Sequence, residues 1–144
     1  MIPAVPSRVY AVIADYRRHH PHIVPPDYFR KVEVVAGGVG AGTRIHVEMR
    51  VMGTTRSFDH VVTEPEPGRL LVESDVDGSS VTTFTVDPAD GGQATHLTIA
   101  TEVVARPGIS GALERRLSSW VLGRIYREQI ARVAKYLEGS GEKA

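Results

Sequence analysis

Three of the chain's six histidines lie in one ten-residue stretch, RRHHPHIVPP, from Arg17 to Pro26. Histidine binds metal ions and transfers protons near neutral pH, so this stretch is the first candidate for chemistry. A metal site needs three or four converging ligands. Pro21 disturbs the helical turn on which His19 and His22 would share a face, and no acidic residue lies at ligand spacing. We expect no metal here. The two arginines could bind an anion, but a solvated loop is the simpler interpretation.

His60 indicates a different chemistry, because it lies on a predicted strand. In SFDHVVTEPEPG, the side chains of Phe58, His60 and Val62 share one face at a period of two. A histidine in an apolar cavity can orient the carbonyl or hydroxyl group of a ligand, or act as a general base. The alternative is a core histidine that is satisfied by a neighbour or a water molecule. His46 and His96 fall on the predicted outer face and are assigned no role.

The segments that carry these residues alternate apolar and polar side chains and are separated by turn residues. This pattern predicts about six antiparallel strands with one buried and one wet face. The segments EPEPG, DVDG and DPADGG are typical of hairpin turns, and GGVGAG predicts a flexible hairpin loop. Ser74 and Thr101 could hold the polar end of a ligand. The side chains predicted to line the inner face are Val47, Met49, Phe58, His60, Val62, Val72, Ser74, Phe84, Ile99 and Thr101.

Two helices are predicted, one before the strands in the chain and one after them. Ser7 is a good N-cap, and the apolar residues after it recur at helical spacing, which predicts a helix over about Ser7–Asp15. The proline-rich stretch then forms at most a short helical turn and a loop. From Ser110 to Leu137 there is no proline, and the apolar spacing predicts one long amphipathic helix that ends at Gly139. Its apolar face carries Leu117, Trp120 and Val121, which either pack in the core or line a cavity.

Composition excludes several classes of protein. The chain has 144 residues and no cysteine, which removes disulfides, thiolate nucleophiles and cysteine-type zinc sites. Its 17 basic and 17 acidic side chains disfavour a nucleic-acid-binding role. No apolar run is long enough to span a bilayer, so we expect no membrane insertion, and without a signal-peptide pattern we expect the cytoplasm. The glycines of GGVGAG precede no helix, so no phosphate loop and no cofactor are expected.

The order of elements is a short helix, a proline loop, antiparallel strands and one long helix. A single helix cannot fill the concavity of a large curved sheet, so we expect an internal cavity. This order, together with VPSRVYAVIADYRRHHPHI, VVTEPEPGRLLVE and YREQIARVAKYLE, resembles the START-like (SRPBCC) superfamily of Bet v 1-type, lipid-transfer and polyketide cyclase/dehydrase-like proteins. The resemblance implies an α+β helix-grip fold, a curved antiparallel sheet wrapped around the long C-terminal helix. We expect a single domain over residues 1–138 and a flexible tail over 139–144.

The resemblance leaves three functions open. The first is binding of a small hydrophobic, lipid- or polyketide-like molecule in the cavity, with His60 setting its orientation. The second is a cyclase or aromatase reaction in the same cavity, in which His60 moves protons. The third is a protein-interaction module without a ligand. Whether a reaction is catalysed stays open, because no Ser/His/Asp spacing stands out.

Two further expectations follow from the resemblance. The proline loop would lie near one mouth of the cavity, with Ile23 and Phe29 as its apolar contacts. Superfamily members usually begin with a full-length strand, whereas only MIPAV precedes the first helix here. A shortened strand leaves a sheet edge partly exposed, which favours a homodimer.

Overall fold

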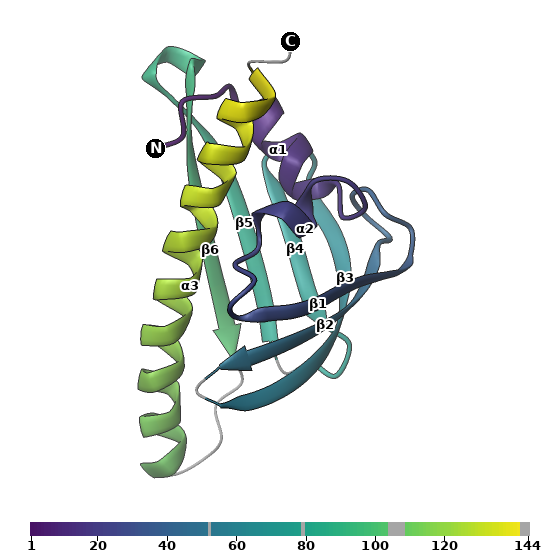
Figure 1. The fold of residues 1–144 in the computed structure, drawn as a ribbon, viewed down its shortest axis with the longest axis vertical. Helices are drawn as coiled ribbons and strands as arrows, with labels where there is room; N and C mark the ends of the chain where they lie inside the picture. The colour runs from purple at the N-terminus through teal and green to yellow at the C-terminus, as the bar shows by residue number, and fades with distance from the viewer. Residues whose placement is uncertain (52, 79, 104–108, 142–144) are drawn as a thin grey trace.

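The computed structural model describes residues 1–51, 53–78, 80–103 and 109–141, and within these it leaves out the side chains of 51, 103, 109–122, 140 and 141. These described residues form three α-helices and one antiparallel sheet of six strands in the order β1-β2-β3-β4-β5-β6, arranged as in Figure 1. The elements are α1 (Pro6–Ala14), α2 (His20–Ile23), β1 (Phe29–Ala36), β2 (Arg44–Val51), β3 (Thr54–Glu66), β4 (Leu70–Asp75), β5 (Ser80–Ala89), the 3-10 turn Asp90–Gly92, β6 (Ala94–Val103) and α3 (Ile109–Gly141).

All three helices lie on one side of the sheet (Figure 1). α3 runs across β6, and α1 packs between α3 and the strands β5 and β6. The short helix α2 joins α1 to α3 on this inner side. The side chains between these layers form one apolar core, as expected for an amphipathic helix against the buried face of a sheet. Its fully buried members include Val9, Ile13, Ile23, Val62, Leu71, Phe84, Val86 and Val133. The predicted α+β class, with a curved antiparallel sheet and a long C-terminal helix, is confirmed.

The helix ends differ slightly from those predicted. α1 begins at Pro6 with Val5 as its N-cap, and no side chain caps it, so the assignment of Ser7 as the N-cap is wrong. The fixed φ of proline suits the first helical position, and that places Ser7 inside the first turn. α2 is the short helical turn that the prolines allowed. α3 continues to Gly141, past the predicted end at Gly139, because one glycine weakens a helix without having to end it.

One strand presents the opposite face from the one predicted. In β4 the buried residues are Leu71, Glu73 and Asp75, whereas Val72 and Ser74 are only half-buried on the outer face. The ladder confirms this, because Glu73 lies opposite Val62 on β3, and residues opposite each other share a face. The inward assignment of Val72 and Ser74 is therefore wrong. In LLVESD, the alternate positions Leu70, Val72 and Ser74 are more apolar than Leu71, Glu73 and Asp75, so the sequence pattern favours the wrong set for the buried face.

The N-terminal segment forms one bridge where the resemblance implied a full strand. Ile2 and Thr95 exchange two backbone hydrogen bonds, of 2.7 and 2.9 Å. This places the start of the chain against the free edge of β6. Among the described helices, none combines the length and the hydropathy required to cross a membrane.

Candidate functional site

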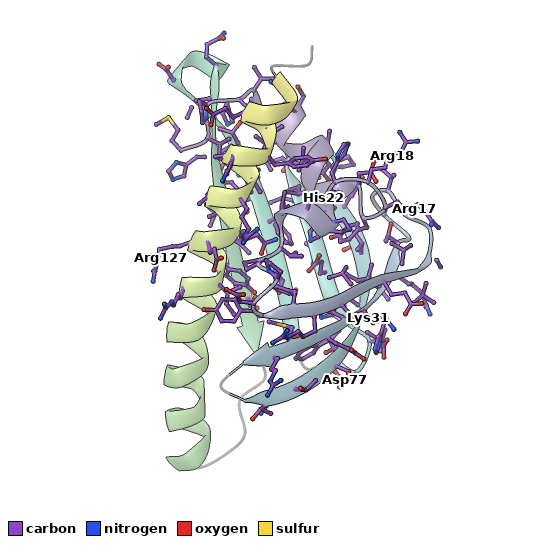
Figure 2. The ribbon with its side chains drawn as sticks, viewed as in Figure 1. Arg17, Arg18, His22, Lys31, Asp77 and Arg127 are labelled. Atoms are coloured by element: carbon purple, nitrogen blue, oxygen red, sulfur yellow. The ribbon has the colours of Figure 1, made fainter. Side chains whose placement is uncertain are left out.

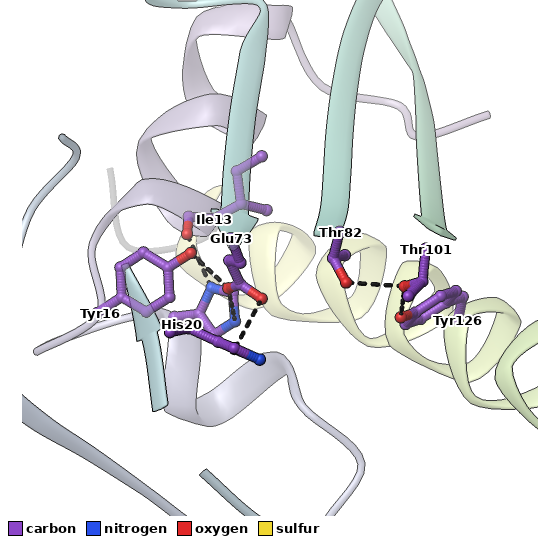
Figure 3. Close-up of polar contacts among 8 residues, drawn as sticks. Ile13, Tyr16, His20, Glu73, Thr82, Thr101 and Tyr126 are labelled. Atoms are coloured by element: carbon purple, nitrogen blue, oxygen red, sulfur yellow. Dashed lines mark hydrogen bonds and ion pairs between the residues drawn. The ribbon is translucent and has the colours of Figure 1, made fainter. Parts of the chain in front are cut away.

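The concave face of the sheet carries a buried carboxylate at its centre. Glu73 on β4 is 8% exposed and lies on the inner face with Val62. The hydroxyl of Tyr16, which follows α1, donates a hydrogen bond to Glu73 Oε2 at 2.5 Å (Figure 3). Tyr16 is held there by its backbone N–H, which donates to the carbonyl of Gly38 at 2.8 Å. A buried carboxylate requires such partners, because an unpaired buried charge is expensive.

His20 on α2 encloses the same side of the carboxylate. Its Nδ1 lies 2.7 Å from the carbonyl oxygen of Ile13. A carbonyl only accepts, so Nδ1 carries the proton and donates it. The ring stacks on Tyr16 with centroids 4.3 Å apart, and its Nε2 lies 3.9 Å from Glu73 Oε2. Both Tyr16 and His20 therefore approach the Oε2 side of Glu73 (Figure 3).

His60 on β3 approaches the other carboxylate oxygen. Its Nδ1 lies 3.9 Å from Glu73 Oε1, which is too long for a hydrogen bond. This Nδ1 is buried and has no hydrogen-bond partner within the described part of the chain. A buried polar atom without a partner costs about 1–3 kcal/mol and calls for an explanation. At this separation of 3.9 Å, a single further polar atom could lie within hydrogen-bond distance of both Nδ1 and Oε1.

A second polar group continues across the sheet from Glu73. Thr82 on β5 lies directly opposite Glu73, and Thr101 on β6 lies opposite Thr82. The two threonine hydroxyls are 2.7 Å apart, and Thr101 is also hydrogen-bonded to the hydroxyl of Tyr126 on α3 (Figure 3). The inner face therefore carries one line of polar groups from β3 to α3, surrounded by apolar side chains.

Burial determines the protonation of both tyrosines. Burial raises the pKa of Tyr16 well above its usual value, and the adjacent Glu73 carboxylate raises it further. The pKa of Tyr126 is also raised, mainly by burial, although its hydrogen bonds to threonine oppose the shift. Both phenols therefore stay neutral donors around neutral pH.

Most of the residues that the sequence predicts for the inner face lie on that face in the structure. Met49 and Phe58 are half-buried and pack against the core. Val72 and Ser74 are the two exceptions described above. The residues on the inner face are Val47, Met49, Phe58, His60, Val62, Phe84, Ile99 and Thr101. Ile23, the last residue of α2, is buried in the core, and Phe29 packs against the core at the start of β1. The predicted helix residues Leu117, Trp120 and Val121 lie outside the residues whose side chains are described.

Sequence reasoning missed five members of the polar group: Tyr16, His20, Glu73, Thr82 and Tyr126. The available signal was in LLVESD, where Glu73 and Asp75 fall on the same face as Leu71 at a period of two. Tyr16 and Tyr126 read as ordinary apolar positions of helices, because a tyrosine ring packs in a core whether or not its hydroxyl has a task.

His20 is the residue of the RRHHPHIVPP stretch that lies at Glu73, and other residues of the stretch contact the β1–β2 loop and α3. The Arg17 guanidinium donates to the carbonyl of Gly37 at 2.7 and 2.9 Å. His19 Nδ1 lies 2.7 Å from the hydroxyl of Tyr136 on α3, and the His22 ring stacks on the same tyrosine. Arg17 and Arg18 point outward, on the side of the molecule away from Arg127 of α3 (Figure 2).

Comparison with known proteins supports this assignment of the fold. The family described as polyketide cyclase/dehydrase and lipid transport matches residues 1–138. No curated protein matches the sequence.

Solved structures resemble the chain over nearly its whole length. The KanY protein is 28% identical, with a TM-score of 0.82 over 95% of this chain and 92% of that one. A protein from Thermus thermophilus, TTHA0849, is 21% identical, with a TM-score of 0.71 over 96% and 93% of the two chains. Ara h 8.0201 shares the fold at 15% identity, with a TM-score of 0.59 over 93% of each chain. The chain is therefore a helix-grip protein of the SRPBCC superfamily and belongs to the polyketide cyclase/dehydrase and lipid transport family.

Proposed function

We propose that the protein binds a small hydrophobic molecule, lipid- or polyketide-like, between the concave face of the sheet and α3. The polar end of that molecule lies against His60 and Glu73. The observation that carries this proposal is the buried Nδ1 of His60, which has no partner among the described residues and lies 3.9 Å from Glu73 Oε1. The family description and the apolar character of the inner face support the same class of ligand.

Apolar contact would supply most of the affinity in this arrangement. Each square ångström of apolar surface removed from water contributes about 25 cal/mol before the costs of association. The few polar groups on the inner face then decide which way round the molecule lies, as in most small-molecule sites. His60 and Glu73 take this role because they lie side by side among residues such as Phe58 and Val62.

Native mass spectrometry of the freshly purified protein, followed by organic extraction, tests the proposal. We expect an added mass that extracts as a lipophilic molecule. A clean apo mass, together with no thermal stabilisation by a panel of hydrophobic ligands, would contradict it and favour an interaction module. The His60→Phe variant should change the order of ligand affinities more than the melting temperature. His96→Phe, on the exposed outer face, is the matched control and should change neither.

A second candidate function is an enzyme of the polyketide cyclase type that acts at the same place, between the concave face of the sheet and α3. The observation that favours it is the pairing of a carboxylate with an imidazole, Glu73 and His60, next to the neutral phenol of Tyr16. Two titratable groups around one position can take a proton from a bound molecule and return it elsewhere. Under this hypothesis Glu73→Gln abolishes turnover of a polyketide-like substrate while binding is retained. Equal losses of binding and turnover would leave binding as the function.

A further inference from the structure

We infer that the polar end of the ligand is a hydroxyl group, carried by an alcohol, a phenol or an enol, rather than a bare carbonyl, an ether or a carboxylate. This inference rests on the proposed function and narrows it. It follows from the donors and acceptors that the described residues leave unused around Glu73.

The two oxygens of Glu73 differ in what they still require. Oε2 accepts the hydrogen bond of Tyr16 at 2.5 Å, and His20 Nε2 lies on the same side at 3.9 Å. Oε1 faces His60 instead. An ionised carboxylate only accepts hydrogen bonds, so Oε1 requires a donor.

His60 requires the opposite kind of partner. A lone pair on its Nδ1 would face the lone pairs of Glu73 Oε1, so the proton belongs on Nδ1, which then acts as a donor. This N–H lacks an acceptor within the described part of the chain. The position between the two residues therefore presents one donor and one acceptor.

Among the residues whose side chains the structure describes, the hydroxyls of the polar line next to Glu73 are already engaged. Thr82 lies opposite Glu73 on the next strand, but its hydroxyl pairs with that of Thr101 at 2.7 Å. Thr101 in turn is hydrogen-bonded to Tyr126. A group from outside the polar line must therefore complete the pair formed by His60 and Glu73.

A hydroxyl is the simple group that satisfies both sides at once. Its O–H donates to Glu73 Oε1, while its oxygen accepts from His60 Nδ1–H. A carbonyl or an ether oxygen would accept from His60 but direct its own lone pairs at Oε1. A carboxylate would add a second negative charge beside Glu73, and an ammonium group has no lone pair for His60. Water can occupy the position when no ligand is bound.

The test compares two probes that differ only in this group, 2-naphthol and 2-methoxynaphthalene. Titration calorimetry gives the ratio of their dissociation constants for the wild-type chain. We expect 2-naphthol to bind at least about tenfold more tightly, because a hydrogen bond to a charged group is exchanged for an unmatched acceptor. In Glu73→Gln the amide N–H₂ donates in place of the carboxylate, so the ratio should collapse or reverse in favour of the ether.

The control for this variant is His46→Gln, on the outer face of β2, which should leave the ratio unchanged. If Glu73→Gln fails to fold, His60→Phe supplies an independent reading. Both probes accept from His60, so its loss should weaken both of them, while Glu73 keeps the preference for 2-naphthol; a preference that disappears with His60 would contradict the role given to Glu73. Equal affinity of both probes for the wild-type chain would overturn the hydroxyl inference while leaving hydrophobic binding intact. Binding of neither probe, together with a clean apo mass, would overturn the proposed function itself.

Discussion

Glu73 is the residue at which the inner face of the sheet meets the first two helices. Its carboxylate accepts from Tyr16 after α1, lies near His20 on α2 and faces His60 on β3. A buried carboxylate is tolerated only where such partners surround it. The same side chain therefore both connects the sheet to the first two helices and offers a ligand a charged hydrogen-bond acceptor.

The hydrogen bond between Tyr16 and Glu73 should contribute measurably to the free energy of unfolding. Tyr16→Phe removes one hydrogen bond to a charged group and leaves the ring packing unchanged. We expect the free energy of unfolding, measured in urea, to fall by about 1.5–3 kcal/mol. Tyr28→Phe is the control, since no hydrogen bond of the Tyr28 hydroxyl is seen in the described residues, and it should cost much less. Equal effects of the two variants would contradict the role given to Tyr16.

Tyr16 should also make the protein less stable in alkali. Burial and Glu73 raise the pKa of Tyr16 in the folded state above the 10.0 of a free tyrosine. Above pH 10 the unfolded chain therefore loses this proton first and holds fewer protons than the folded chain. Below pH 10 this contribution of Tyr16 to stability is fully present. As the pH rises above 10, the free energy of unfolding falls by up to about 1.4 kcal/mol per pH unit. Urea unfolding at pH values from ~9 to ~11 should show this slope in the wild type, with a smaller slope in Tyr16→Phe.

At the scale of single residues, the sequence predicts apolar faces better than polar partners. His60 was placed correctly beside Phe58 and Val62, because three alternating positions agreed. Val72 was placed wrongly because apolar residues occupy one alternation of β4, while the buried carboxylates occupy the other. The buried carboxylate of Glu73 is stabilised by Tyr16, which is 57 positions away in the chain. The local spacing of residues around Glu73 does not predict that contact.

The loop between β1 and β2 packs its backbone closely against the end of α1. GGVGAG was expected to be a flexible hairpin loop, but it packs against the end of α1. The N–H of Gly40 donates to the carbonyl of Ala14 at 2.9 Å, and Gly38 accepts from Tyr16 at 2.8 Å. Gly37, at φ +71°, approaches the backbone of Thr43 so closely that a Cβ would lie 2.9 Å from its Cα. These glycines allow two backbones to meet, and the loop thereby holds Tyr16 in place.

This close approach predicts a difference between two glycines of the same loop. Gly37→Ala and Gly42→Ala both place a side chain at positive φ, at +71° and +89°, which costs about 1–2 kcal/mol. A Cβ at Gly42 meets nothing within 4 Å, whereas one at Gly37 meets backbone that cannot rotate away. We expect Gly37→Ala to lower the melting temperature clearly more than Gly42→Ala. Equal shifts in a thermal unfolding experiment would mean that the loop moves to accept the Cβ.

At the scale of elements, the type of each long segment could be read from its period, and the ends could not. α3 was predicted because apolar residues recur at helical spacing without proline, and it ends only two residues later than expected. The N-cap of α1 was misplaced because Pro6 and Ser7 are both acceptable starts, and only the chain before them selects one.

The architecture of the whole molecule depends on how its two ends meet. Ile2 is 1% exposed, its N–H donates to the carbonyl of Thr95, and the Thr95 hydroxyl donates to the carbonyl of Ala4 at 2.7 Å. Arg8 on α1 donates to the carbonyl of Leu137 near the end of α3 at 3.3 Å. A cleft of about 190 Å³ lies beside these contacts, between the N-terminal residues and α3. The N-terminal segment thus joins the edge of β6 to the long helix.

This junction predicts that two adjacent N-terminal residues differ sharply in importance. Ile2→Ala removes a fully buried side chain and should cost about 2–4 kcal/mol of the free energy of unfolding. Met1→Ala is the control, because Met1 is 75% exposed and should be replaceable without effect. Loosening the Ile2–Thr95 bridge also frees the edge of β6, and an unpaired edge strand pairs readily with another chain. We therefore expect size-exclusion chromatography with light scattering to show more self-association for Ile2→Ala than for the wild type. If Ile2→Ala instead matched Met1→Ala in both measurements, the bridge between Ile2 and Thr95 would not protect the edge of the sheet.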